Sequence, residues 1–372
     1  MKVKWIYVAL GWAVIFPELF IRLAYGITLK PFLDTIGGNY LVGGAVLAGF
    51  YVGYMGGNIP FSYLVDSRGY RVVAGEMVGT VLGAILFSAS KNALEAGTGM
   101  FVMGLASAAT YTASMKLVVE HSNKYKSVAV GLLETAGPGV VLISGAVLPS
   151  TLSFTSWQNV YLTVAAISMV LCVPLLLIHA SRKKPESSTK SLLLSGRLWS
   201  LSAVRFFGLW GLWGASTWLY SVLRLYYSFS PIQAGEDVTL FGVLGVLAVP
   251  ASGLLSDLLR ERRKVAMLTL ILFFSSLLLF PLTPRDFVWL TVSILGFLAF
   301  AYRSPLDTII AEYRKGLTAT SMGVANTVSQ ASQIVVPIMV GAVLTFLGNY
   351  VLLFTIISIG PGLAALTLWR LR

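Results

Sequence analysis

The chain has 372 residues, of which 56% are hydrophobic and only 11% are charged. A soluble domain carries about 25% charged residues, so this composition excludes a soluble protein and indicates a chain embedded in a lipid bilayer. The formal net charge of +12 could indicate nucleic-acid binding, but the basic residues lie between hydrophobic runs and form no patch on a polar domain. The charge pattern therefore argues against a nucleic-acid partner.

Twelve apolar runs of roughly 20 residues, the length that spans a bilayer as an α-helix, follow one another along the chain. They predict an all-α membrane protein with six helices on each side of a polar link at residues 182–197. Residues 1–181 are then an N-terminal six-helix bundle and residues 198–372 a C-terminal one. The expected spans are 5–28, 40–63, 70–90, 96–118, 127–149, 157–180, 198–226, 237–258, 264–283, 286–311, 318–347 and 349–370.

The basic residues are divided unequally between the loops that join these spans. With the N-terminus inside, the inner loops hold twenty lysines and arginines, among them Lys116, and the outer loops hold four, among them Arg285. By the positive-inside rule both termini are expected in the cytoplasm. Separately, we expect the protein to lie in the cell membrane as a monomer. The other three basic residues lie within spans and are Arg22, Arg205 and Arg303.

One loop and its surroundings recur in the second half of the chain. The segment 62–71 reads Ser-Tyr-Leu-Val-Asp-Ser-Arg-Gly-Tyr-Arg, and the segment 253–263 again places an aspartate four residues after a small residue, with arginines following. The two aspartates, Asp66 and Asp257, are 191 residues apart. An offset of 192 relates Gly104, Glu120 and Gly131 to Gly296, Glu312 and Gly323. The two halves are therefore expected to be repeats of one unit.

Twelve spans arranged as six plus six, with the pattern small-x-x-x-Asp-x-x-Gly-x-Arg after the second and a degenerate copy after the eighth, resemble the major facilitator superfamily. The pattern departs from the usual form because Ser62 replaces the leading glycine, and Ser67 and Tyr70 stand where basic residues are common. The resemblance implies two pseudo-symmetric bundles that move a small molecule by alternating access.

The same resemblance implies a cytoplasmic gate at this loop. Asp66 would hold the gate shut by pairing with the N-terminal end of the eleventh helix, where the helix dipole favours an anion. A solvated loop aspartate is the alternative. Glu120 and Glu312 are expected to pair with the loop arginines. The expected gating residues are Asp66, Gly69, Arg71, Glu120, Asp257 and Glu312.

The first span carries Glu18 and Arg22, which share one helix face because they are four residues apart. A charged side chain within a bilayer is costly unless it faces a cavity or a partner. Either the two form a self-neutralising pair that only orders the helix, or Arg22 anchors a substrate and Glu18 carries a proton.

The third to fifth spans each contain one polar feature. Glu76 is expected to be structural, snorkelling to the interface or pairing with Arg71, with proton handling as the alternative. Tyr111 stands in the fourth span, which lacks the arginine that many members of the superfamily carry there. Glu134 in the fifth span is a lone carboxylate on a helix of small residues and is a proton-site candidate. A structural pairing of Glu134 with Arg205 or Lys116 is the alternative.

The second half adds further candidates for a central site. Trp218 in the seventh span is a candidate to line a cavity, although a lipid-facing position is the alternative for the aromatic residues of that span. Arg303 either pairs with Asp307, four residues later, or faces the cavity opposite Arg22. The eleventh span carries three amides on one stripe, which face the interior and either bind a polar substrate or join helices. They are Asn326, Gln330 and Gln333.

The leading functional hypothesis is a secondary active transporter of a small polar solute, in particular an organic anion held by Arg22 and Arg303, with protons as the coupling ion. The pattern Arg22-x-x-Tyr-Gly, followed by Pro31, resembles monocarboxylate and oxalate/formate-type carriers. The alternative is a multidrug/proton antiporter that exports lipophilic compounds, which the Gly137-Pro138 pair and the aromatic content favour. A non-transporting sensor should carry an extra soluble domain, and no stretch is long enough for one.

An enzyme is not expected. Cys172 is the only cysteine, and the two histidines, His121 and His179, lie near helix ends. These residues provide neither a nucleophilic triad nor a metal-binding cluster, so the sequence predicts no metal and no other cofactor.

Overall fold

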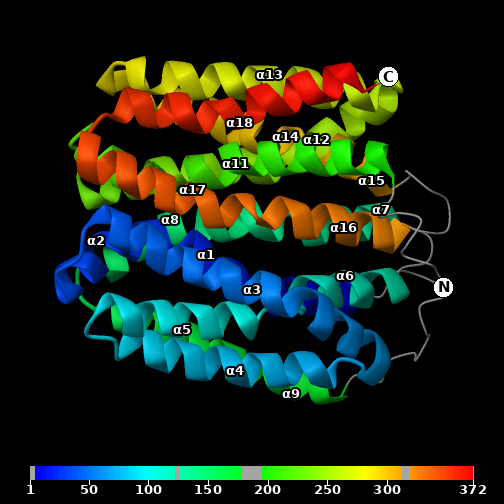
Figure 1. Ribbon diagram of the computed structural model, residues 1–372, viewed down its shortest axis with the longest axis horizontal. Coiled ribbons are helices and arrows are strands. Elements are labelled where there is room, and N and C mark those ends of the chain that lie inside the picture. Colours follow the sequence, from blue (N-terminus) through cyan, green and yellow to red (C-terminus); the bar gives the residue numbers. More distant parts are fainter. Residues whose placement is uncertain (1–4, 122–125, 178–194, 312–317, 372) are drawn as a thin grey trace.

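The computed structural model describes residues 5–121, 126–177, 195–311 and 318–371 (Figure 1). Within these ranges every regular element is a helix and no strand occurs, which confirms the all-α expectation. Glu312 and most of the expected 182–197 link lie outside the described residues.

In the described ranges, each half of the chain forms six helical passes, several of them built from two shorter helices. The first half consists of α1 (Trp5–Leu23) with α2 (Tyr25–Ile36), α3 (Tyr40–Arg68), α4 (Arg71–Ser88), α5 (Ala93–Leu105) with α6 (Thr110–Glu120), α7 (Lys126–Glu134) with α8 (Ala136–Thr151), and α9 (Trp157–Leu177). The second half consists of α11 (Gly196–Leu225), α12 (Pro231–Leu259), α13 (Arg262–Leu279), α14 (Val288–Ala301) with α15 (Arg303–Ala311), α16 (Thr318–Gln330) with α17 (Ser332–Ala342) and the π-helical turn η3 (Val343–Leu347), and α18 (Tyr350–Arg370). Two short 3-10 turns, η1 (Phe280–Leu282) and η2 (Arg285–Phe287), join α13 to α14.

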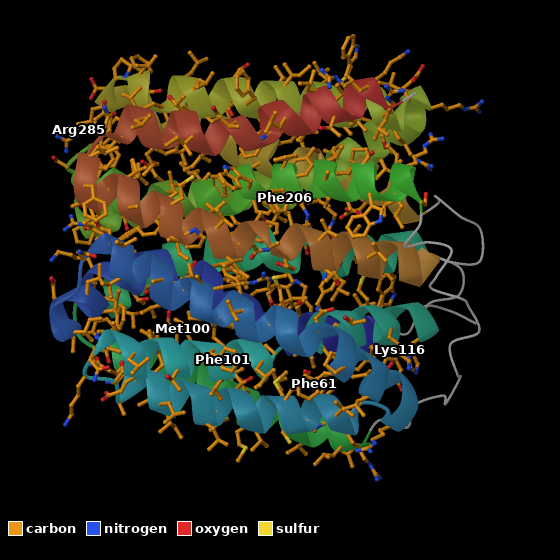
Figure 2. The ribbon with its side chains drawn as sticks, in the orientation of Figure 1. Phe61, Met100, Phe101, Lys116, Phe206 and Arg285 are labelled. Atoms are coloured by element: carbon orange, nitrogen blue, oxygen red, sulfur yellow. The ribbon has the colours of Figure 1, made fainter. Side chains whose placement is uncertain are left out.

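Ten of these passes are long and apolar enough to cross a membrane. The other two, α5–α6 and α11, run beside them over the same length of the molecule (Figure 1). α1 begins and α18 ends at one end of the molecule, which we name the proximal end, and the opposite end is the distal end. Figure 2 shows Lys116 toward the proximal end and Arg285 at the distal end, so a residue expected in an inner loop and one expected in an outer loop lie at opposite ends.

The helices begin and end at residues suited to those positions. The side chains of Asn39, Asn92 and Asn349 each accept a hydrogen bond from the backbone N–H three residues later, at 3.0, 3.0 and 2.9 Å. Such N-caps satisfy a donor that the first helical turn leaves free. Gly37 and Gly348 end α2 and η3 in the left-handed conformation that glycine adopts without strain.

The internal repeat seen in the sequence is present in the packing. A Cβ atom on Gly104 of α5 would lie 1.9 Å from the carbonyl oxygen of Phe50 in α3. A Cβ atom on Gly296 of α14 would lie 2.3 Å from the carbonyl oxygen of Phe241 in α12. Because these pairs are related by offsets of 192 and 191 residues, the same helix-to-helix contact occurs in both bundles. The expected pseudo-symmetry is thereby confirmed.

The bundles also meet where α2 crosses α11. A Cβ atom on Gly26 would lie 1.8 Å from the carbonyl oxygen of Thr217. Ser221 Oγ also donates to the Gly26 carbonyl at 3.4 Å. Gly26 and Thr217 are themselves 191 residues apart, so each is the repeat partner of the residue that it contacts.

Two further contacts join the distal halves of the bundles. A Cβ atom on Gly44 of α3 would lie 2.1 Å from the carbonyl oxygen of Pro337 in α17. A Cβ atom on Gly235 of α12 would lie 2.6 Å from the carbonyl oxygen of Gly145 in α8. Backbones approach this closely only where side chains are absent. These contacts therefore hold the distal ends of the bundles together.

Five of the twelve passes are interrupted near mid-length. The first pass extends to Ile36, beyond the expected boundary at residue 28, because α2 restarts after the break and continues to its glycine cap. The interruptions are at Ala24, residues 106–109, Thr135, Tyr302 and Ala331. Broken helices free backbone polar groups, which are tolerated at membrane depth only where they are buried in protein or line a cavity.

We predict that Gly26→Val will open the distal contact, because its side chain cannot fit against the Thr217 carbonyl. The readout is the rate at which a bulky thiol reagent labels a Ser221→Cys variant in a Cys172→Ala background. Gly26→Val is expected to raise this rate roughly tenfold, which corresponds to destabilising the closed contact by ~1.4 kcal/mol relative to the open state.

The matched control is Gly56→Val on α3, because a Cβ atom there meets nothing within 4 Å. Labelling that is equal in the Gly26→Val and Gly56→Val variants would contradict the importance of the contact.

Candidate functional site

A cavity lies between the two bundles at the level of the helix breaks. Its enclosed volume is about 40 Å³, which is room for a few water molecules. The first half contributes α1, α3, α6, α7 and α8 to its wall, and the second contributes α11, α15 and α16. Its lining residues are Ile15, Leu19, Arg22, Tyr54, Tyr111, Leu133, Glu134, Ala136, Gly137, Arg205, Leu209, Trp213, Arg303, Asn326 and Gln330.

Arg22 projects from α1 into this cavity and is buried. Its Nη2 atom lies 2.8 Å from Glu18 Oε1, so the expected ion pair within α1 is present. Its Nη1 atom donates to Gln333 Oε1 on α17 at 3.1 Å, which joins the two bundles. The guanidinium also lies 5.2 Å from the ring centroid of Trp213 and 5.8 Å from that of Tyr54, within the range of cation–π attraction. Arg22 is therefore neutralised by Glu18 and also lines the cavity.

Arg303 forms the second contact between the bundles at this level. Its Nη2 atom donates to Glu134 Oε2 at 2.8 Å, and these residues come from α15 and α7. The other oxygen of Glu134 accepts a hydrogen bond from the Tyr111 hydroxyl at 2.6 Å. The Glu134 carboxylate thus lies between a cation of one bundle and a phenol of the other bundle. Arg303, and not Arg205, is its partner.

The expected alternative that Arg303 pairs with Asp307 is wrong. Asp307 Oδ1 instead accepts a hydrogen bond from Arg205 Nε on α11 at 2.9 Å. Arg205 Nη1 also donates to Asn326 Oδ1 at 3.0 Å and to Ser329 Oγ at 2.6 Å, both on α16. These contacts all lie within the second bundle, and they leave Arg303 to pair across the cavity.

The amides of the eleventh pass connect the arginines of the two bundles. Gln333, which accepts from Arg22, donates to Gln330 Oε1. Gln330 in turn lies 3.5 Å from Asn326 Oδ1, the atom that accepts from Arg205. The three amides therefore form a hydrogen-bonded row that joins helices, which is one of their two expected roles. The other expected role, binding a polar substrate, stays a prediction.

Three arginines and three carboxylates gather around the cavity, and their charges cancel. Each arginine has its own carboxylate, in the pairs Arg22–Glu18, Arg205–Asp307 and Arg303–Glu134. A buried charge is retained only when it is paired, because its desolvation is costly. With all six groups ionised, the site carries no net charge.

The sequence matches the family described as Major Facilitator Superfamily over residues 11–337, which is most of the chain. The chain belongs to the major facilitator superfamily. No curated protein matches the sequence. Together with the apolar passes, the family match makes the protein a multi-pass membrane protein and a secondary transporter of small molecules. Members of this superfamily are transporters and not enzymes.

Substrate sites of such transporters lie near the bilayer midplane, at the interface of the repeats and beside broken helices. The cavity occupies this place, because it lies between the bundles and Ala136, Arg303 and Gln330 of its wall each border a helix break. The cavity is therefore the candidate substrate site of this member of the superfamily.

Most of the residues expected at the substrate site line this cavity. These are Arg22, Tyr111, Arg303, Asn326 and Gln330, and Glu134 of the two proton-site candidates lines it as well.

The remaining candidates lie behind the cavity wall or away from it. Glu18 and Gln333 are outside the lining and reach the cavity through Arg22. Trp218 is also outside the lining; it is buried in α11 and its ring meets that of Tyr40 edge-on at 6.2 Å. Its contact with α3 belongs to the junction between the bundles.

Tyr54 and Trp213 also line the cavity and were not expected there, and Arg205, which was expected only as an alternative partner of Glu134, lines it as well. For Arg205 a signal was available, because an arginine within a span is as costly there as Arg22 or Arg303. No periodicity distinguishes Tyr54 and Trp213 from the other aromatic residues of their helices.

The loop after α3 and its copy after α12 each contain a residue with positive φ at the equivalent position. Gly69 ends α3 with a φ of +81°, and Arg260, 191 residues later, has a φ of +54°. Arg71 begins α4 and is exposed. The repeat therefore extends to the sign of φ at this position of the expected gate. The gating role itself stays a prediction, because the described part of the structure does not include Glu312 or the side chains of Asp66, Glu120 and Asp257.

The expectation that Glu76 snorkels or pairs with Arg71 is wrong. Glu76 is 5% exposed, and its Oε1 atom accepts a hydrogen bond from the backbone N–H of Ala109 at 2.9 Å. Ala109 is the N-cap residue of α6, so the carboxylate caps the restarted half of the fourth pass. Thr80 Oγ1 donates to the Ala106 carbonyl on the other side of the same break, at 3.2 Å. These two side chains fix the break that positions Tyr111.

We predict that Glu76→Leu will lower the thermal stability of the purified protein, because it removes the acceptor of the Ala109 N–H. Loss of a helix cap costs about 1–2 kcal/mol. Glu76→Gln keeps an acceptor oxygen at this position and is expected to retain most of the stability. Equal melting temperatures for the Leu and Gln variants would contradict the capping role.

Proposed function

We propose that the protein is a proton-coupled transporter of small organic anions that works by alternating access. The observation that carries this proposal is the Arg303–Glu134 pair, a 2.8 Å contact that joins the two bundles on the cavity wall. While Glu134 is ionised it occupies Arg303, and a substrate anion competes with it. Protonation of Glu134 neutralises the competitor and frees Arg303 to bind the anion.

The charge balance of the cavity sets the stoichiometry that we propose. Because the three arginines and three carboxylates cancel, an added negative charge is unfavourable unless one carboxylate takes up a proton. Each negative charge of the substrate is then accompanied by one proton. Glu134 is the first candidate for this proton because it lines the cavity, and Glu18 is the second.

We propose that Arg22 and Arg303 bind the substrate from opposite bundles. Both line the cavity, and Arg22 is held toward it by Glu18 and by Gln333. Tyr111, Asn326 and Gln330 supply further hydrogen-bonding groups on the wall. Apolar residues such as Leu19 and Leu209 also line it, which favours an anion with an apolar portion. In this proposal Gln333 positions Arg22, and Trp218 belongs to the junction between the bundles.

We infer from the positive-inside rule that the proximal end faces the cytoplasm. The protein would then lie in the cell membrane with both termini on its cytoplasmic side. The two moving bodies are residues 1–181 and 198–372, joined by the link at 182–197, in a monomer. The distal glycine contacts support an assignment of the structure to a state that is closed toward the outside. In the opposite state these contacts separate, and the expected gate around Asp66, Gly69, Arg71 and their copies closes the cytoplasmic side.

A multidrug/proton antiporter remains the second candidate. In its favour, Pro138 stands at the start of α8 beside the cavity, and the aromatic residues Tyr54 and Trp213 line the wall. All three arginines line the wall, but of their carboxylate partners only Glu134 does, and this arrangement favours an anion over a lipophilic cation. Transport of lipophilic cations that needs no anion would decide for the antiporter.

We predict that Glu134→Gln will uncouple transport from the proton gradient. In proteoliposomes the variant should lose accumulation driven by a pH gradient but retain exchange of labelled for unlabelled substrate. In the wild type, anion affinity should rise as the pH falls, because protonation of Glu134 releases Arg303; the variant should lose this dependence. Asp286→Asn, at an exposed position of η2, is the control. Accumulation that survives in the Glu134→Gln variant would assign the proton to another carboxylate.

We predict that Arg22→Ala and Arg303→Ala will each weaken anion binding by roughly 10- to 100-fold, the effect of losing a hydrogen bond to a charged group, about 1.5–3 kcal/mol. Binding is measured as the ligand-dependent rise in melting temperature with a panel of small carboxylates. Arg285→Ala, an exposed change at the distal end, is the control. Unchanged affinity in both cavity variants would reject the anion site.

A further inference from the structure

The fifteenth helix presents an acid and a base that do not pair with each other. Arg303 and Asp307 are four residues apart, a spacing at which oppositely charged side chains meet on one helix face. Arg303 instead contacts Glu134 of the other bundle, and Asp307 contacts Arg205 of its own bundle. Some feature of the structure must keep the two neighbours on α15 apart.

We propose that Arg205 is a positioning residue that reserves Arg303 for the other bundle by occupying Asp307. This inference rests on the proposed function, because it concerns the cation assigned to the substrate. Arg205 carries no role in that scheme as a substrate ligand.

The contacts of Arg205 hold it in one place. It is 4% exposed, and its Nε atom donates to Asp307 Oδ1 at 2.9 Å while Nη1 donates to Asn326 and Ser329 at 3.0 and 2.6 Å. All four residues belong to the second bundle, on α11, α15 and α16. The Arg205–Asp307 pair can therefore move with that bundle as one unit. The Arg303–Glu134 pair, by contrast, joins two bodies and has to break when they separate.

Arg303 and Asp307 each have one side-chain atom that makes no hydrogen bond to the described residues. Within the described residues, Arg303 Nε and Asp307 Oδ2 are buried and have no hydrogen-bond partner. If Arg205 is removed, Asp307 loses the cation that pairs with it among the described residues, and Arg303 is the neighbouring cation on the same helix. Arg303 then turns to Asp307, and its contact with Glu134 across the cavity is lost.

The test uses the full-length protein in detergent without substrate, in a Cys172→Ala, Ser221→Cys background, and measures the rate of labelling by a bulky thiol reagent. Ser221 contacts Gly26 where the bundles meet, so its labelling reports their separation. Glu134→Gln removes the ion pair between the bundles and is expected to raise the rate about tenfold. Arg205→Gln is expected to raise it to a similar extent.

Two further variants separate positioning from a general structural role. Arg205→Gln combined with Asp307→Asn should return labelling to within about twofold of the wild type, because no carboxylate is left to capture Arg303. Arg205→Lys should also remain near the wild type, because it still neutralises Asp307. A structural role through Asn326 and Ser329 would leave the double variant as impaired as Arg205→Gln, and that result would overturn the inference.

The outcomes also distinguish this inference from the proposed function. If Glu134→Gln leaves labelling unchanged, the contact between Glu134 and Arg303 does not hold the bundles, and the proposed coupling fails together with the inference. If Glu134→Gln raises labelling but Arg205→Gln does not, only the positioning role of Arg205 is rejected.

Discussion

The structure around the cavity depends on one constraint, which is that six ionised side chains share an apolar interior and must neutralise one another there. A charged side chain within a membrane-spanning segment is costly without a partner, and each of Arg22, Arg205 and Arg303 lies against a carboxylate. The pairs differ in reach. One lies within a single helix, one within a single bundle and one between bundles. Only the last has to break when the bundles separate, and this is why we assign the coupling to Arg303 and Glu134.

The helix breaks bring these groups to one level. Glu134 is the last residue of α7, Arg303 is the first of α15, and Gln330 ends α16. The break at residues 106–109 is held by its surroundings, because Glu76 and Thr80 bond to the backbone on either side of it. The carboxylate of Glu76 thus serves to place Tyr111, which in turn donates to Glu134. The geometry of the site therefore depends on side chains that do not line the cavity.

The sequence was sufficient to predict the twelve passes and the repeat, because both leave periodic marks in it. Apolar length determines the passes, and the constant offset of 191 or 192 residues reappears as equivalent backbone contacts at Gly104 and Gly296. The approximate composition of the site was also predictable, because charged and amide side chains within spans need an interior partner. Arg22, Arg303 and Glu134 were singled out on this ground and do line the cavity.

The pattern of pairing was not predictable, since local spacing was the only geometric guide. Spacing suggested Arg303 with Asp307, whereas the structure joins Arg303 to Glu134, 169 residues away, and Asp307 to Arg205. Glu76 was misjudged for a similar reason, because its acceptance of a backbone N–H from Ala109 depends on a break in another pass. Trp218 shows that an aromatic residue on a cavity helix can still be committed to the junction between bundles.

The contact between Gly26 and Thr217 has a consequence for how the two halves can diverge. The atom that excludes a side chain at position 26 is the backbone carbonyl oxygen of Thr217, which any residue at position 217 would carry. Position 26 is therefore confined to glycine whatever residue stands at position 217, whereas the second copy accommodates threonine. Equivalent substitutions in the two repeats thus have different consequences, although the fold relates the two positions.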